Sequence, residues 1–182
     1  LQFEPHPRFA VFADVPFRSL SPSIIPDASG ISDVRAGVKV GLVASDLRAL
    51  TFQFRSYFPT GDSEKGLGTD HPSVEFTLLY NDTFAERVSF GAEVGTWSAI
   101  DSSSAIPVAA DDDWAGNILR WGFGLGFDLV GKPEFGFAPV AEIVGWRLLG
   151  GYASVTPDGT PENLQIPSVE GLNIVNLKLG GR

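Results

Sequence analysis

The 182-residue sequence contains no cysteine and no methionine, and it has only two histidines. The lack of cysteine excludes disulfides, thiolate metal sites and cysteine nucleophiles. Because the chain begins at Leu1 and contains no methionine, we expect a mature or partial chain from which a signal peptide is already missing. Basic residues are also scarce: the net charge is −9. A nucleic-acid partner is therefore not expected, since no basic stripe is present to neutralise phosphates.

Long hydrophobic runs are a further absence. No apolar run reaches the roughly 18 residues that a transmembrane helix requires, and helical periodicity is hard to find anywhere. Even so, 43% of the residues are hydrophobic, and glycine (21) and phenylalanine (14) are abundant. This combination predicts an all-β chain, which is either a soluble protein or a β-barrel that lies in a membrane.

Strict alternation of apolar and polar residues is what the sequence does contain. Residues 117–131 place Leu, Trp and Phe at odd positions, and Arg, Gly and Asp at even positions. Alternation of this length predicts a β-strand, because successive side chains point to opposite faces of a sheet. Similar alternation predicts eight strands, at residues 8–20, 31–44, 48–59, 73–82, 87–99, 116–130, 134–150 and 171–181.

The connections between these segments alternate in length. Short connections occupy residues 45–47, 82–86 and 131–134, whereas the long ones occupy residues 21–30, 60–72, 101–115 and 154–170. A soluble sandwich mixes connection lengths irregularly, but an up-and-down membrane barrel has short turns on one side and long loops on the other. We therefore predict an all-β, antiparallel up-and-down (meander) transmembrane β-barrel, with about eight strands in this chain. Residues 1–182 would form a single domain, truncated at both ends and part of a larger barrel.

The two faces of the segments predict which side meets lipid. The polar face is rich in glycine, which would weaken a strand that faces water but leaves room inside a barrel for a neighbouring long side chain. Acids and bases on this face are equal in number, and charges in a membrane strand are tolerated only facing an interior or water. We predict that the following residues line the lumen: Arg35, Lys39, Arg55, Glu75, Glu93, Arg120, Asp128, Glu142 and Lys178.

Aromatic residues near the segment ends predict two girdles at the lipid–water boundaries. The girdle beside the long loops would contain Tyr57, Phe58, Trp97, Trp114 and Tyr152, and the girdle beside the short turns would contain Phe9, Tyr80, Phe84, Phe127 and Phe135.

Segment 134–150 fits the alternation poorly. An inward Glu142 places Val144 and Trp146 on the inner face and Arg147 on the lipid face, and Pro139 interrupts the ladder. A bulge near Pro139 or a position of Arg147 at the rim would each explain this.

Patterns that suggest chemistry are few. Asp70, His71 and Ser73 are neighbours in an extended loop, which does not supply the geometry of a catalytic triad. The acidic run at residues 111–113, with Asn117, lacks the spacing of an EF-hand, so a solvated loop or loose divalent bridging to lipopolysaccharide is favoured there. We expect no catalytic residue, no cofactor and no specific metal site, because no general base is paired with a nucleophile.

Three short motifs carry a resemblance to a known family. Gly30, Asp33 and Lys39 form the first, the run Pro59–Thr60–Gly61–Asp62 forms the second, and Gly66, Gly68 and Thr69 form the third. In these motifs the chain resembles outer-membrane β-barrels described as transporters of the phenol-degradation MetA-pathway type, with many planctomycete members. The first motif departs from the family at Ser32, where a glycine is usual, and at Val40, where a tyrosine is usual. The resemblance implies a barrel of more than eight strands and transport of small molecules, aromatic ones included.

These expectations together favour an outer-membrane channel or transporter of a Gram-negative bacterium. Its partners would be the lipid bilayer with lipopolysaccharide and a small solute; the oligomeric state stays open. Charged residues along the inner face would then select solutes. One alternative is a closed barrel whose lumen charges only neutralise one another, with a structural or anchoring role. The second alternative is a soluble β-protein with a ligand cavity.

Overall fold

The computed structural model describes residues 1–21, 27–84, 87–100, 116–132, 135–152 and 167–181. The described residues form β-strands, turns and extended segments, and they are an antiparallel meander. No helix long and apolar enough to cross a membrane occurs among them.

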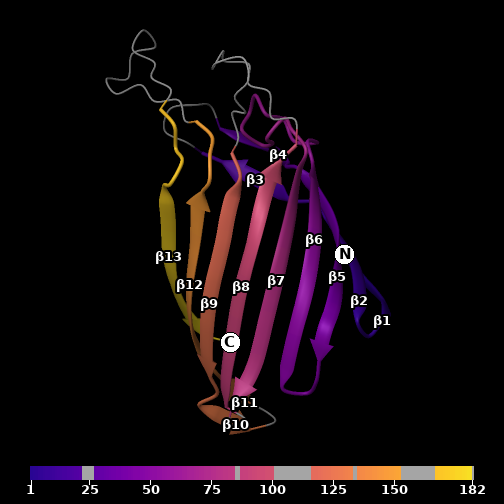
Figure 1. The fold of residues 1–182 in the computed structure, drawn as a ribbon, viewed down its shortest axis with the longest axis vertical. Coiled ribbons are helices and arrows are strands. Elements are labelled where there is room, and N and C mark those ends of the chain that lie inside the picture. The colour runs from indigo at the N-terminus through magenta and orange to yellow at the C-terminus, as the bar shows by residue number, and fades with distance from the viewer. Residues whose placement is uncertain (22–26, 85–86, 101–115, 133–134, 153–166, 182) are drawn as a thin grey trace.

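Nine strands build the main sheet, in the order β1-β2-β5-β6-β7-β8-β9-β12-β13, and every neighbouring pair is antiparallel. Figure 1 shows them side by side as one curved sheet, from β1 at one edge to β13 at the other. The strands are β1 (Gln2–His6), β2 (Phe9–Asp14), β5 (Val34–Ala44), β6 (Arg48–Phe58), β7 (Ser73–Phe84), β8 (Val88–Ala99), β9 (Ile118–Phe127), β12 (Pro139–Leu148) and β13 (Asn173–Gly181).

Two small hairpins lie within connections of the main sheet. The first pairs β3 (Phe17–Leu20) with β4 (Ala28–Ile31), and the second pairs β10 (Val130–Lys132) with β11 (Phe135–Phe137). Figure 1 places β3 and β4 at the end of the sheet with the long connections, and β10 and β11 at the opposite end. Three of the expected strands are therefore each divided between the main sheet and a small hairpin. These are the segments expected at residues 8–20, 116–130 and 134–150.

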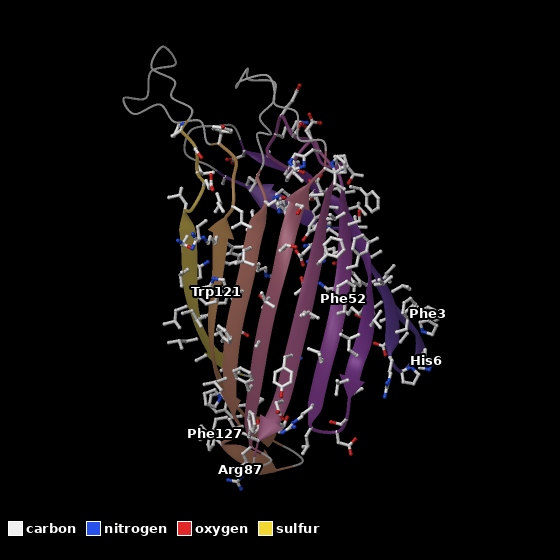
Figure 2. The ribbon with its side chains drawn as sticks, viewed as in Figure 1. Phe3, His6, Phe52, Arg87, Trp121 and Phe127 are labelled. Atoms are coloured by element: carbon white, nitrogen blue, oxygen red, sulfur yellow. The ribbon has the colours of Figure 1, made fainter. Side chains whose placement is uncertain are left out.

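The alternation of short and long connections is confirmed from β5 to β9. The connections from β5 to β6 and from β7 to β8 are short turns, and Figure 2 labels Arg87 and Phe127 at this end of the sheet. The connection from β9 to β12 at the same end was expected to be a short turn and instead carries the β10–β11 hairpin. Strand β1 was not expected, because its five residues include Pro5 and show little alternation.

The described strands do not close into a barrel. Strand β1 pairs only with β2 and strand β13 pairs only with β12, so the sheet has two open edges. All nine described residues of β13 are exposed. The described strands therefore form the expected antiparallel meander, but as an open sheet and not as the expected closed barrel.

The pairing of β12 resolves the segment that fitted the alternation poorly. Opposite β9, Glu142 faces Gly124, Val144 faces Gly122 and Trp146 faces Arg120, in regular register from Val140 to Leu148. The discontinuity lies at Ala138, between β11 and β12, rather than as a bulge inside β12. Arg147 lies one residue from the end of β12, at the rim beside the long connections.

Burial on the two faces is the reverse of that in a water-soluble sheet. On β7, Glu75 and Thr77 are 4% and 3% exposed, whereas their neighbours Phe76 and Leu78 are 45% and 42% exposed. On β9, Phe123 is 50% exposed. The exposed face therefore carries the large apolar side chains, and we call the opposite face, which buries its polar groups, the inner face.

Candidate functional site

A chain of ion pairs crosses four neighbouring strands on the inner face. Arg55 Nη1 of β6 lies 3.3 Å from Glu75 Oε1 of β7, and Arg120 Nη1 of β9 lies 3.8 Å from Glu75 Oε2. Arg120 also binds Glu93 of β8 in a bidentate manner, with Nε 2.9 Å from Oε1 and Nη2 3.0 Å from Oε2. Two bases and two acids thus form one neutral network, which we call the arginine–glutamate ladder.

Hydroxyl groups complete the ladder around Glu75. The Tyr57 hydroxyl donates to Glu75 Oε2 at 2.8 Å and accepts from Arg55 Nη1 at 3.2 Å. Thr77 Oγ1 donates to Glu75 Oε1 at 3.1 Å. Burial of a carboxylate is tolerated when its oxygens are paired and hydrogen-bonded, and Glu75 meets both conditions.

Glycines make room for these long side chains. Gly95 stands opposite Arg120, and Gly122 stands opposite Glu93, in the β8–β9 pair. A Cβ at Gly122 would lie 3.1 Å from Glu93 Cγ, and one at Gly95 would lie 2.7 Å from Thr77 Oγ1. The glycine-rich inner face therefore lets the ladder lie flat against the sheet.

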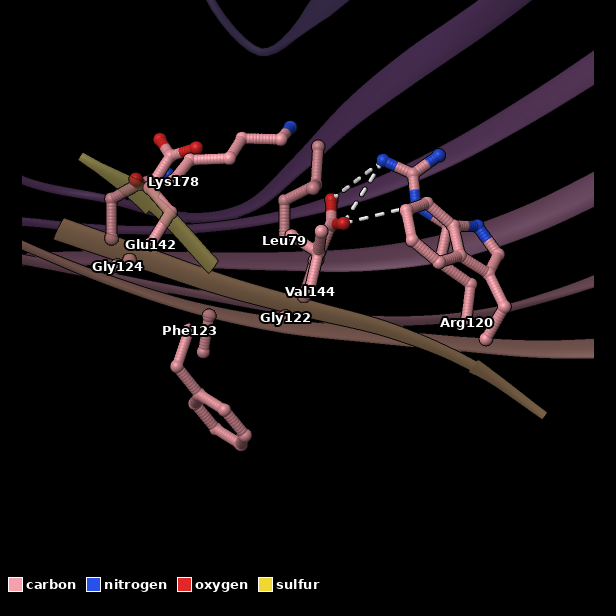
Figure 3. A pocket seen from close by; sticks show the side chains of 13 residues that line it. Leu79, Arg120, Gly122, Phe123, Gly124, Glu142, Val144 and Lys178 are labelled. Atoms are coloured by element: carbon pink, nitrogen blue, oxygen red, sulfur yellow. Dashed lines mark hydrogen bonds and ion pairs between the residues drawn. The ribbon is translucent and has the colours of Figure 1, made fainter. Parts of the chain in front are cut away.

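A cavity of about 310 Å³ continues the inner face towards β13. Glu142 of β12 and Lys178 of β13 are cross-strand partners on its wall. Figure 3 shows both side chains on the same side of the sheet as Arg120, with Phe123 pointing to the other side. No ion pair joins Glu142 or Lys178 to a charged residue in the described ranges, so both charges face the cavity.

The remaining predicted lumen residues lie apart from the ladder. Lys39 of β5 is on the inner face, where its Nζ lies 3.3 Å from Gln2 Oε1 and 5.3 Å from the centre of the Phe12 ring. Arg35, also of β5, lies 3.9 Å from Asp14. Asp128 lies past the end of β9, at the short-connection end, where its backbone N–H donates to Arg87. The structure therefore groups Arg55, Glu75, Glu93 and Arg120, and it places Asp128 away from them.

Asp33 is a buried residue whose role the sequence analysis missed. Its Oδ1 accepts from the Gly61 N–H at 3.0 Å, and its Oδ2 accepts from the Thr69 N–H at 2.9 Å and the Thr69 hydroxyl at 2.8 Å. Thr60 Oγ1 accepts from the Val34 N–H at 2.9 Å. The three motifs that carried the resemblance thus meet in one cluster, which fastens residues 59–69 to the start of β5. Their short spacing and glycine content were the signal that could have indicated a tight loop anchor.

Close backbone approach explains two glycines of this cluster. A Cβ at Gly68 would lie 2.6 Å from Gly61 O and 2.6 Å from Asp33 Oδ1. Leu67, beside it, is 3% exposed and lies under the β3–β4 hairpin, where a Cβ at Gly30 would be 3.0 Å from its Cδ1.

At the solvated side of the same loop, the Lys65 ammonium donates to Asp62 and holds the pKa of that carboxyl below its usual range.

Aromatic residues on the inner face were also missed or misplaced. Phe12 of β2 is 8% exposed, and the guanidinium of Arg55 lies 5.6 Å from its ring centre. Trp97 is an inner-face residue opposite Glu75, and its ring centre lies 5.9 Å from that of His71. Tyr57 also lies on the inner face, where its hydroxyl donates to Glu75. The expected place of both residues in a lipid-facing girdle is therefore wrong. Residue parity along β8 would have indicated the position of Trp97. Trp114, from the same expected girdle, lies outside the described residues.

The residues considered for catalysis and metal binding form no such site in the described part of the chain. His71 Nδ1 lies 3.3 Å from the Pro72 carbonyl, and among the described residues His71 makes no hydrogen bond to Ser73. Asp70 adopts a positive φ of 60° in the turn before it. Groups of three or more acidic or histidine side chains able to hold a metal are absent from the described ranges. The acidic run at residues 111–113 lies outside the described residues.

Comparison of the chain with protein-family models and with curated proteins finds no match. The family resemblance of the three motifs therefore stays a prediction.

Proposed function

We propose that this chain is the membrane-spanning part of a Gram-negative outer-membrane β-barrel that passes small solutes along its polar inner face. The observation that carries the proposal is the inversion of the two faces. Phe123 and Leu125 are 50% and 56% exposed on one side, whereas Glu75 is 4% exposed on the other. Water would disfavour this arrangement, because the transfer of apolar surface out of water is favourable. Lipid favours it, since alternation of apolar-out and polar-in side chains is typical of membrane barrels.

The charges of the inner face support a solute path. The wall of this cavity carries Glu142 and Lys178, an acid and a base on directly opposite residues that form no ion pair with each other or with another described residue. Rings of charged side chains select solutes in pores by attraction and repulsion at short range. The proposed role is passage of small molecules without a catalytic step, and it needs no cofactor.

One observation favours a second function. The arginine–glutamate ladder is neutral and internally hydrogen-bonded, as the lumen of a closed barrel with a structural or anchoring role would be. A soluble β-protein with a ligand cavity is disfavoured by the exposed apolar face.

Single-cysteine labelling tests the proposal, because the native chain contains no cysteine. Gly124→Cys places the thiol on the inner face, where a Cβ meets Glu142 Cγ at 3.5 Å and the Ala141 carbonyl oxygen at 3.9 Å, both ordinary contacts. Phe123→Cys is the matched control on the opposite face. In outer membranes, we expect a small water-soluble thiol reagent to label residue 124 and not residue 123, and we expect the purified protein to conduct ions across a planar bilayer.

The outcomes separate the three functions. Labelling of residue 124 with conductance supports the channel. Shielding of both positions without conductance would instead support the closed barrel. A detergent-free soluble protein in which residue 123 is shielded and residue 124 reacts would overturn the membrane proposal altogether.

A further inference from the structure

A second cavity lies at the end of the inner face that carries the long connections. Its volume is about 380 Å³, and its walls come from the β3–β4 hairpin, the loop after β6 and the ends of β5, β6 and β8. Side chains of chemical interest on its walls are Arg18, Arg35, Tyr57, Thr69, Ser73 and Trp97. The cavity is separate from the one beside Glu142, with which it shares no residue.

Arg35 brings an incompletely satisfied guanidinium to this cavity. Its Nε is buried and has no hydrogen-bond partner. Its ion pair with Asp14 is long, at 3.9 Å between Nη2 and Oδ2, and 42% of the Asp14 side chain is exposed. The Arg35 side chain as a whole is 33% exposed and lines the cavity, so a ligand there can accept hydrogen bonds from its guanidinium.

The charged side chains on the wall of the cavity are Arg18, Arg35 and Asp33. Arg18 of β3 lines it and forms no ion pair with the described acids. Asp33 also lines it, but its two oxygens already accept three hydrogen bonds from Gly61 and Thr69. These hydrogen bonds come from neutral groups and leave the charge of Asp33 in place, so the two arginines and one carboxylate give the cavity wall one net positive charge.

Part of the remaining wall is apolar and aromatic. Trp97 lines the cavity, and its ring centre lies 5.9 Å from that of the His71 ring. The Tyr57 hydroxyl is occupied by Glu75 and Arg55, so Tyr57 contributes mainly its ring. A volume of about 380 Å³ falls in the range of small-molecule sites, which pair an apolar wall with a few polar anchors.

We propose that this cavity binds the carboxylate of a small organic acid, with Arg35 and Arg18 as the anion-binding groups and Trp97 as the wall for the apolar body. Arginine suits this ligand because its planar fork matches a carboxylate. The inference deepens the proposed function by naming a solute class at the loop end of the inner face, and it rests on that function only for the solute's passage.

Calorimetric titration of the purified protein in detergent tests the inference. The probe is cyclohexanecarboxylate, compared with the neutral cyclohexanecarboxamide of similar shape and with inorganic phosphate. We expect the carboxylate to bind at least about tenfold more tightly than the amide, because the amide carries no charge for the arginines to pair with. It should also bind more tightly than phosphate, because phosphate has no apolar body to contact the Trp97 wall. Affinity should fall as salt is raised, because exposed charge interactions are screened.

Matched variants assign the binding to the cavity. Arg35→Gln and Arg18→Gln should each weaken carboxylate binding about tenfold. Arg18 lies on the exposed β3–β4 hairpin, where a substitution disturbs folding less. Arg147→Gln removes the same charge from the apolar face of β12 and should leave binding unchanged.

Equal affinity for the acid and the amide would overturn the inference. So would an Arg147→Gln variant that loses as much carboxylate affinity as Arg35→Gln. Phosphate binding as tight as the carboxylate would also contradict it, by assigning a bare anion site. Binding requires no current across a bilayer, so its failure is distinguishable from failure of the channel proposal.

Discussion

At the scale of single residues, the polar side chains that organise the inner face act through hydrogen bonds made across long stretches of sequence. Asp33 reaches Thr69, 36 residues away, and Glu75 reaches Arg55, 20 residues away. Residue parity predicts the face on which such a group lies, but it does not predict which partner the fold brings to it. Arg120 and Glu93 were expected on one face, whereas their bidentate pairing depends on a diagonal register that one sequence does not specify.

The Asp33 cluster gives a prediction at this scale. Asp33→Asn replaces one acceptor oxygen by an NH₂ group that must face an N–H donor of Gly61 or Thr69. We expect a loss of about 1–3 kcal/mol in the free energy of unfolding, with faster proteolytic cleavage within residues 60–72. Urea unfolding and limited proteolysis of the folded protein measure the two effects.

Asp62→Asn is the control for that variant, because Asp62 binds the exposed Lys65 of its own turn and anchors nothing in the sheet. It should leave the free energy of unfolding almost unchanged, because an exposed ion pair contributes little. Equal behaviour of the two variants would show that Asp33 does not fasten the loop.

At the scale of strands, long strands are predicted from the sequence better than short ones. The long segments that became β6, β7, β8 and β9 alternate over ten residues or more, and their strand type and faces followed directly from that alternation. Strand β1 and the two hairpins did not, because three to five residues carry too little periodicity to separate a strand from a loop. The bulge of β5 between Gly41 and Val43 was equally invisible, since it depends on the pairing with β6.

The arginine–glutamate ladder yields a prediction about neighbouring strands. Glu75→Gln removes the carboxylate that Arg55 and Arg120 share, and it leaves Arg55 without an ion-pair partner among the described residues. Loss of one member of a buried charge pair should lower the free energy of unfolding by about 3 kcal/mol. Urea unfolding followed by tryptophan fluorescence measures this loss.

A second substitution identifies the cause of that effect. In the double variant Glu75→Gln/Arg55→Gln, no unpaired charge is left at that end of the ladder, so part of the lost stability should return. Additive losses in the double variant would mean that the ladder is not a coupled network.

At the scale of the whole molecule, the number of strands constrains how the sheet can be completed. Every pair in the nine-strand order is antiparallel, so the first and ninth strands, β1 and β13, run in the same direction. Direct closure of the two edges would thus need a parallel seam. Lipid does not tolerate an open edge, because unpaired backbone groups are costly in hydrocarbon. The proposed barrel therefore requires an odd number of additional strands between β13 and β1 to stay antiparallel throughout.

This parity argument predicts the outcome of a cross-linking experiment. Phe3→Cys on β1, combined in turn with Val175→Cys, Leu177→Cys or Leu179→Cys on β13, should give no intramolecular disulfide under mild oxidation of the folded protein in membranes. The positive control is Ile143→Cys with Leu177→Cys, which are directly opposite in the β12–β13 pair. Partners in such a pair lie about 4.5–5.5 Å apart, within the reach of a disulfide. A β1–β13 disulfide formed as efficiently as the control would mean that the two edges meet, and that the nine strands close by a parallel seam of their own.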